Sequence, residues 1–278
     1  MRSVVFRKKG EHPDPRRTEK GKHMNRKDKV FDTITKKPAP SVLRKIYTGR
    51  LVMRCLIFLA CVWLVITHPE QLSILRGWNF FRALSPLHLL WCVWIADMLG
   101  QLIPIPQKLA LGSQKLFHFR FKPLKEAINY QALHRYIVDT TKSAYKVFLI
   151  WAAFVAAVTL LRYLEVLSDT ALFMITAAFY VCDLICVLIW CPFRLIMKNR
   201  CCTTCRIFNW DHLMMFTPML FLRGFFSQSL ILMSIAVWLV WELCVMMYPE
   251  RFWEVSNTAL SCANCTDKLC TQYCQKLR

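Results

Sequence analysis

The strongest constraint on this chain is a series of apolar runs, each about as long as a membrane is thick. Four such runs cover residues 46–67, 86–103, 146–164 and 170–193. Each is close to the ~20 residues that an α-helix needs to cross ~30 Å of hydrocarbon. Because no water is present inside a bilayer to satisfy the backbone, these runs predict helices. The sequence therefore predicts an all-α integral membrane protein.

A fifth apolar stretch, residues 213–248, admits two interpretations. It contains Pro218 and has Arg223-Gly224 near its middle. It is either a short amphipathic segment followed by one span, or a tight hairpin of two helices that turns at Arg223-Gly224. The first interpretation gives five spans and puts the C-terminus outside, whereas the second gives six spans.

A weak internal repeat favours the hairpin. Leu75-Arg76-Gly77 and Leu222-Arg223-Gly224 each precede a pair of phenylalanines and then a span. Asp97 and Glu242 each lie seven residues before a proline near the end of those two spans. We therefore expect about six transmembrane helices arranged as three hairpins, with the C-terminus on the same side as the N-terminus.

Charge sets the expected orientation. The chain is 56% hydrophobic and yet carries a formal charge of +20, so its charge must be segregated. Residues 1–45 carry 15 Lys/Arg and 5 Asp/Glu without apolar periodicity, which predicts a disordered basic tail attracted to anionic lipid headgroups. Lys and Arg recur in 104–145 and 194–206 but are sparse in 68–85 and 165–169. The positive-inside rule therefore predicts a cytosolic N-terminus and a cytosolic C-terminus in a cell inner membrane.

The expected organisation has three parts: the basic tail, a transmembrane domain over 46–248, and a Cys-rich tail over 249–278. The long loop before the third span holds apolar residues at helical spacing from Leu124 to Ile137. This stripe predicts an amphipathic helix on the inner interface, although core packing or contact with a partner would produce the same stripe.

Cysteines suggest a metal site. Two pairs have the C-x-x-C spacing of a tetrahedral site, with two neighbouring cysteines as substitutes: Cys202 and Cys205, Cys262 and Cys265, and then Cys201 and Cys270. A structural zinc ion is our first interpretation and an iron–sulfur cluster is the second. Disulfides, which need an outside tail, and a dithiol exchanging with quinone or a membrane partner remain alternatives. His212 follows these cysteines and is either a further ligand or a solvated side chain.

Intramembrane charges form the second candidate site. Asp97, Asp183 and Glu242 lie within spans, where a charged carboxylate costs about 2.5–3.5 kcal/mol. Arg54 lies about as far from the inner face as Asp97 does, which predicts an Arg54–Asp97 ion pair. Such groups either hold the bundle together or line a pocket for a proton, a cation or a basic substrate.

The segment Asn199–Pro218 (NRCCTTCRIFNWDHLMMFTP), with Tyr248–Arg251 and CANCTDKLC, resembles a family of uncharacterised multi-pass membrane proteins from anaerobic Firmicutes. The similarity covers about residues 190–271. It implies a bacterial cytoplasmic membrane and an anaerobic cell, in which thiols stay reduced. It implies no activity, because none is known for that family.

Motifs for nucleotide binding, serine hydrolysis and zinc proteolysis are absent from the sequence. The sequence thus favours a non-enzymatic function, and its charge pattern does not favour nucleic-acid binding. Three hypotheses follow: an assembly or transport component with a structural metal site, a redox protein that passes electrons to a membrane partner such as quinone, and a small transporter that uses the intramembrane carboxylates.

Overall fold

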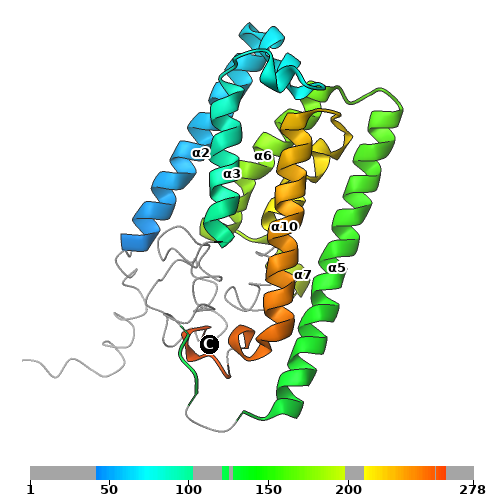
Figure 1. The fold of residues 1–278 in the computed structure, drawn as a ribbon. Coiled ribbons are helices and arrows are strands. Elements are labelled where there is room, and N and C mark those ends of the chain that lie inside the picture. Colours follow the sequence, from blue (N-terminus) through cyan, green and yellow to red (C-terminus); the bar gives the residue numbers. More distant parts are fainter. Residues whose placement is uncertain (1–41, 103–120, 125–127, 198–209, 254, 261–278) are drawn as a thin grey trace, which may run out of the picture. The chain divides into compact units, whose positions relative to one another are not determined.

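Every regular element among the described residues is helical. The computed structural model describes residues 42–102, 121–124, 128–197, 210–253 and 255–260. All of them belong to the second of the two units into which the chain divides, Met1–Pro40 and Ser41–Arg278. The five longer helices are α2 (Val42–Thr67), α3 (Leu87–Leu102), α5 (Tyr130–Tyr163), α6 (Asp169–Leu188) and α10 (Phe225–Met247) (Figure 1). The short elements are η1 (Pro69–Leu75), η2 (Asn79–Phe81), α7 (Pro192–Met197), α9 (Asp211–Phe216), η4 (Thr217–Phe221), η5 (Pro249–Phe252) and η6 (Thr258–Leu260).

Four helices of the described chain, α2, α5, α6 and α10, are long and apolar enough to cross a membrane. Helix α3 is apolar but has only 16 residues, about 24 Å of helix. Large apolar side chains project outward from α2, among them Leu56 and Trp63, which are 61% and 59% exposed. Because such a surface is unfavourable in water, it fits a lipid environment. The all-α membrane class is thus supported, whereas six spans are not confirmed.

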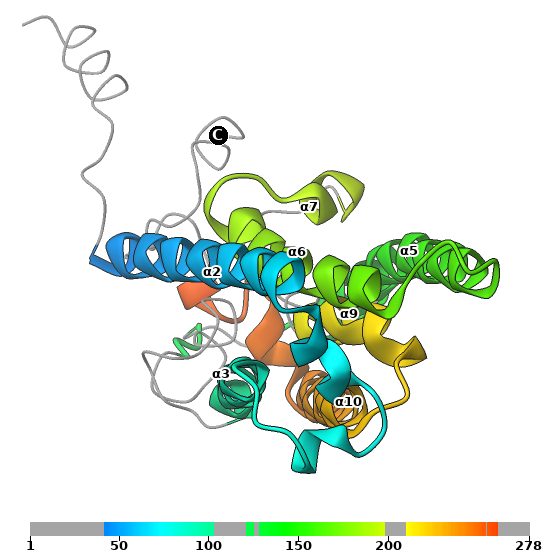
Figure 2. The same ribbon diagram turned by 90° about the horizontal axis from the view of Figure 1, so that it is seen from above.

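The ambiguous stretch from residue 213 to 248 is divided unequally. Leu222–Gly224 forms a turn, and α10 after it is a full-length helix. Before the turn, α9 and η4 hold six and five residues, together about 19 Å, which is too short to span a bilayer. Phe216 and Met219 on this arm are fully buried. The arm packs between α5, α6 and α10, inside the bundle rather than against lipid (Figure 2).

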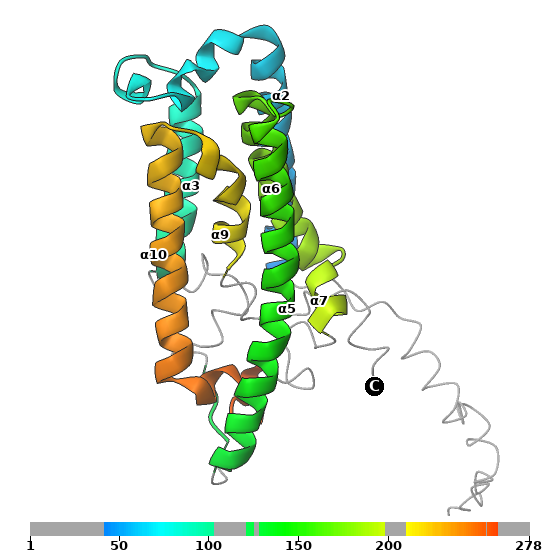
Figure 3. The ribbon, with the colours of Figure 1, turned by 90° about the vertical axis from the view of Figure 1, so that its right-hand side faces the viewer.

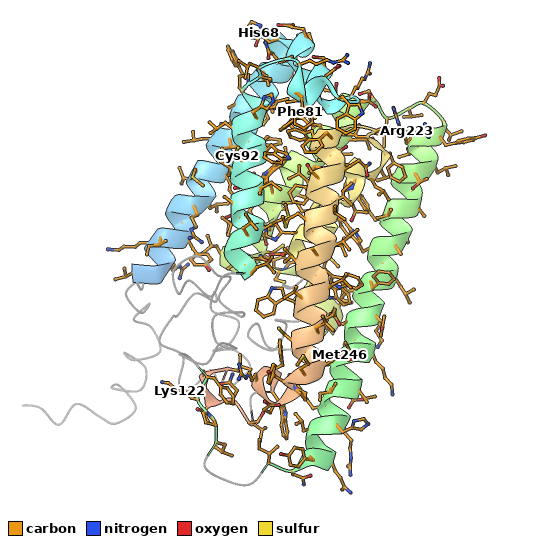
Figure 4. All side chains as sticks on the ribbon, in the orientation of Figure 1. His68, Phe81, Cys92, Lys122, Arg223 and Met246 are labelled. Carbon is orange, nitrogen blue, oxygen red and sulfur yellow. The ribbon has the colours of Figure 1, made fainter. Side chains whose placement is uncertain are left out.

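The connections predicted to be outer loops lie at one end of the bundle, here called the loop end (residues 68–86, 164–168 and 222–224). Nε of Arg76 binds a carboxylate oxygen of Asp169 at 2.7 Å, which joins the first two connections. Figure 4 shows His68, Phe81 and Arg223 at this end, and Lys122 and Met246 toward the other. Helices α3, α6 and α10 therefore all start at the loop end.

The main helix contacts differ from the predicted hairpins. Helix α2 packs most extensively against α6, and α3 packs against α10, so helices adjacent in sequence are not the principal partners (Figure 3). Trp94 of α3 is fully buried at the centre of the core. Its ring contacts Phe173, Tyr180, Phe216 and Phe226. One side chain thus links α3 to α6, α9 and α10.

The predicted interfacial helix is part of α5. This helix runs without interruption for 34 residues, about 51 Å, and so extends well past ~30 Å of hydrocarbon. Asn129 caps it, because the Asn129 side chain accepts a hydrogen bond from the backbone N–H of Ala132 at 3.1 Å. Leu133 and Ile137 lie within its first turns, and Leu124 lies before it. The apolar stripe therefore starts a long helix and does not form a separate one.

The two repeated Leu-Arg-Gly motifs touch each other at the loop end. The backbone N–H of Gly77 donates to the carbonyl of Arg223 at 2.7 Å, and the N–H of Phe225 donates to the carbonyl of Gly77 at 3.0 Å. Gly77 has φ +55°, a conformation that favours glycine. A Cβ on Gly224 would lie 2.1 Å from the carbonyl oxygen of Leu75. This contact therefore admits no side chain at position 224.

We predict that Gly224→Ala separates the two motifs and lowers the free energy of unfolding by about 2 kcal/mol or more, as overpacking does in cores. Gly49→Ala is the matched control, because a Cβ there meets nothing within 4 Å and position 49 is inside helix α2. The control should be neutral or more stable by about 1 kcal/mol. Chemical denaturation in mixed micelles measures both. Equal stability of the two variants would show that the glycine contact does not matter.

Candidate functional site: an intramembrane arginine centre

Arg54 is the most deeply placed charge on helix α2. Its side chain is 9% exposed and faces α6 and α3. Nη1 lies 2.6 Å from Oδ2 of Asp183 and donates to the carbonyl of Tyr180 at 2.7 Å. Nη2 lies 3.1 Å from Oδ2 of Asp97. We call Arg54, Asp97, Tyr180 and Asp183 the arginine centre.

Helix periodicity places these groups together. Tyr180 and Asp183 are three residues apart on α6 and therefore share one face of that helix. The guanidinium carbon of Arg54 lies 4.0 Å from the centre of the Tyr180 ring, a cation–π contact. The Tyr180 hydroxyl lies 3.5 Å from Oδ2 of Asp97, at the limit of a hydrogen bond. Three helices thus supply one buried site.

The two carboxylates of the arginine centre are held unequally. Asp183 is 18% exposed and makes the shorter bond to Arg54, whereas Asp97 is 40% exposed and makes the longer one. With both carboxylates ionised, the centre carries one negative charge more than Arg54 neutralises. Removing charges from water is costly unless they are paired, so this excess charge is the unusual feature of the site.

The polar contacts continue from α3 to α9 and α10. Gln101 lies one turn after Asp97 on α3, and its Nε2 is 3.2 Å from Oδ2 of Asp211. Nδ1 of His212 is 2.8 Å from Oδ1 of Asp211. Beside them, Nε1 of Trp210 donates to Oε1 of Glu242 at 2.7 Å. A layer of polar groups therefore reaches from helix α2 to helix α10.

The structure forms the predicted Arg54–Asp97 pair and adds Asp183 to it. Glu242 accepts a hydrogen bond from Nε1 of Trp210 at 2.7 Å. His212, which we considered as solvated, is 6% exposed and lies against Asp211. The described residues do not show whether it is a metal ligand.

Sequence analysis missed Tyr180, Gln101 and Asp211. Tyr180 lies three residues before Asp183, and Gln101 lies four residues after Asp97. A search for polar residues at helical spacing from each intramembrane acid would have found both. Asp211 starts helix α9 at the edge of an apolar run, and nothing in its local sequence indicates that α9 lies inside the bundle.

The predicted metal ligands lie outside the described residues: Cys201, Cys202, Cys205, Cys262, Cys265 and Cys270. Within the part of the chain that the structure describes, no group of three or more His, Cys, Asp or Glu side chains could hold a metal ion. The cysteines of that part form no disulfide with one another. The zinc and iron–sulfur hypotheses therefore stay predictions.

Comparisons with known proteins add no family. No protein-family model matches the chain, and neither a curated protein nor a solved structure matches it. The resemblance to membrane proteins of anaerobic Firmicutes therefore stays a prediction. What this chain does has to be argued from its own side chains.

We predict that Arg54→Met lowers the free energy of unfolding by about 3–5 kcal/mol, because it leaves Asp183 and the partly exposed Asp97 without their positive partner. Adding Asp97→Asn and Asp183→Asn should restore most of that stability, since the arginine centre then carries no charge. Arg76→Met is the control: Arg76 also pairs with an aspartate but its side chain is 74% exposed, and its loss should cost at most about 1 kcal/mol. Denaturation in micelles compares the variants. Equal costs for Arg54→Met and Arg76→Met would contradict a stabilising role of the arginine centre.

Proposed function

We propose that this protein is a small multi-pass membrane transporter that passes a proton or a small cation through the arginine centre. One observation carries the proposal: Asp97 and Asp183, on different helices, share the single buried guanidinium of Arg54. Ionisable groups inside a membrane are expensive to maintain and mark ion and proton pathways. This is the third of the functions that the sequence suggests, and the contacts of Arg54 favour it over the other two.

A purely structural role of Arg54 would need only one carboxylate as its partner. Asp183 supplies it, with the 2.6 Å bond and the smaller exposure. Asp97 is then the exchangeable partner, because it is held at 3.1 Å and is 40% exposed. When Asp97 takes up a proton or a cation, Arg54 keeps its bond to Asp183 and the excess negative charge disappears. The arginine centre can therefore bind a positive charge while the Arg54–Asp183 ion pair stays in place.

The interrupted helix beside the centre also supports transport. The α9–η4 arm begins inside the bundle at Asp211 and ends at the loop end, and α10 starts after a turn. Substrate and ion sites of secondary transporters are typically formed at such discontinuous helices, where irregular backbone lies inside protein. We keep six passes in this proposal, with α3 and the α9–η4 arm as shortened ones.

The proposal places the end opposite the loop end in the cytosol. Helix α2 starts at this end and α10 finishes there, as helix direction requires. The chain after α10 joins the basic loop, since the N–H of Thr258 donates to the carbonyl of Lys122 at 2.9 Å. The positive-inside rule then orients the protein in a cell inner membrane, with lipid as its principal partner.

The test is proton flux in proteoliposomes under an imposed potassium diffusion potential, followed with an internal pH dye. Asp97→Asn keeps the shape of the side chain and removes its charge, so we expect at least a tenfold loss of flux. Glu70→Gln is the control, because Glu70 is an exposed carboxylate that pairs with His68 at 3.0 Å at the loop end. Its flux should equal that of the unmodified protein. Equal flux for Asp97→Asn would refute the proposal, and flux no greater than in protein-free liposomes would refute its proton form.

We also propose that Cys202, Cys205, Cys262 and Cys265 bind one structural zinc ion. The described flanks of these cysteines support it. Met197 and Trp210, on either side of the first pair, belong to one apolar cluster. Leu124 of the basic loop donates its N–H to the carbonyl of Ser256, a few residues before the second pair. The described residues next to both cysteine pairs therefore belong to the same unit, Ser41–Arg278.

Metal content of protein purified anaerobically in detergent tests the zinc site. We expect about one zinc per chain and no visible colour, because zinc has a filled d shell. Cys202→Ser with Cys265→Ser should remove the metal and lower the folded yield. Iron with sulfide and a brown spectrum would instead support the redox hypothesis. Metal-free protein at full folded yield would exclude both centres.

A further inference from the structure

The amide of Gln101 carries one unsatisfied oxygen deep inside the bundle. Gln101 is 7% exposed, and its Nε2 points at the carboxylate of Asp211, 3.2 and 3.4 Å from the two oxygens. Within the described structure, Oε1 of Gln101 accepts no hydrogen bond. An unpaired buried acceptor is costly, and native proteins rarely keep one without a partner of some kind. The unpaired oxygen of the Gln101 amide therefore indicates a binding site for a ligand.

The carboxylate of Asp211, next to the Gln101 amide, can accept further bonds. Its Oδ1 accepts the backbone N–H of His212 at 2.6 Å and lies 2.8 Å from the ring nitrogen Nδ1. Among the residues that the structure describes, its Oδ2 has only the long contact with Nε2 of Gln101, at 3.2 Å. An ionised carboxylate oxygen can accept more than one bond. Gln101 of α3 and Asp211 of α9 thus form one hydrogen-bonded pair in the core, and each has an oxygen that can accept a further bond.

The surrounding charges call for a positive ligand. Asp97, Asp183 and Asp211 carry three negative charges, and Arg54 supplies one positive charge. Even a protonated His212 would leave one negative charge unbalanced. Glu242, on α10 beside Trp210, adds a further carboxylate to this side of the bundle. A ligand with a single positive charge would therefore neutralise Asp97, Asp183, Asp211, Arg54 and a protonated His212, and Glu242 favours a positive ligand further.

We infer that Gln101 and Asp211 bind a small monovalent cation, with Na⁺ as the physiological candidate. Amide and carboxylate oxygens are hard ligands that suit alkali and alkaline-earth ions rather than soft metals. The role of the ion in transport rests on the proposed function, but its binding does not.

Thermal unfolding of the full chain in detergent, followed by tryptophan fluorescence, tests binding alone. Sodium chloride is compared with choline chloride at equal ionic strength and constant pH. A ligand that binds only the folded state raises the unfolding midpoint, and we expect a rise of about 5 °C in saturating Na⁺. Gln101→Met keeps the length of the side chain and removes the oxygen, so the rise should disappear. Asp211→Asn should abolish it independently if Gln101→Met does not fold.

Gln228→Met is the matched control. Gln228 lies at the loop end of α10, where its Nε2 donates to the carbonyl of Leu222 at 3.0 Å. This variant should keep the whole rise in midpoint. Its retention shows that loss of the rise in Gln101→Met comes from the missing amide of Gln101 and not from a glutamine-to-methionine change in general.

The outcomes separate this inference from the proposed function. Equal midpoints in Na⁺ and choline for the unmodified protein would overturn the cation site, as would a Na⁺ effect kept in both Gln101→Met and Asp211→Asn. A midpoint that follows pH but not Na⁺ would assign these groups to a proton instead and overturn the inference too. A specific Na⁺ effect, together with unchanged flux for Asp97→Asn in liposomes, would keep the cation site and refute the proposed function.

Discussion

The guanidinium of Arg54 is the constraint on which the rest of this structure depends. A guanidinium inside a membrane must be paired, because its removal from water is far more costly than one hydrogen bond returns. Its donors reach α6 at Asp183 and Tyr180, and α3 at Asp97. This requirement explains why α2 packs on α6, a helix more than a hundred residues away, instead of on its neighbour in sequence. The ion pairs thus determine which helices pack together, a choice that hydrophobicity alone does not determine.

A second set of contacts, at the loop end, fixes how deep each short segment reaches. The backbone bonds between Gly77 and Phe225 hold the start of α10 beside the connection that leads into α3. Since η4 ends immediately before this contact, the α9–η4 arm is anchored at the loop end and its first residue, Asp211, lies about 19 Å below it. At that depth Asp211 meets Gln101. A close glycine contact at one end therefore places polar groups in the middle of the bundle.

The sequence predicted the helical class, the position of most long helices and the Arg54–Asp97 pair, because apolar length and depth from a helix end are local properties. It did not predict that Asp183 shares Arg54, since the contact between α2 and α6 depends on three-dimensional packing. It also assigned a full hairpin to residues 213–248. Hydropathy is the same for an apolar residue whether lipid or protein surrounds it. Met219, for example, is surrounded by protein, because it is fully buried in the structure. A buried arm need not match the thickness of a bilayer.

The arginine centre and the Gln101 site are electrostatically linked through one helix. Asp97 and Gln101 are four residues apart on α3, so their side chains occupy neighbouring positions on one face. A positive charge bound at Gln101 and Asp211 therefore repels a positive charge arriving at Asp97, and the low dielectric of the interior strengthens the effect. Linkage requires the reverse to hold to the same degree. Mutual exclusion between the two proposed sites would suit exchange of one cation for another, and helix α3 carries one residue of each.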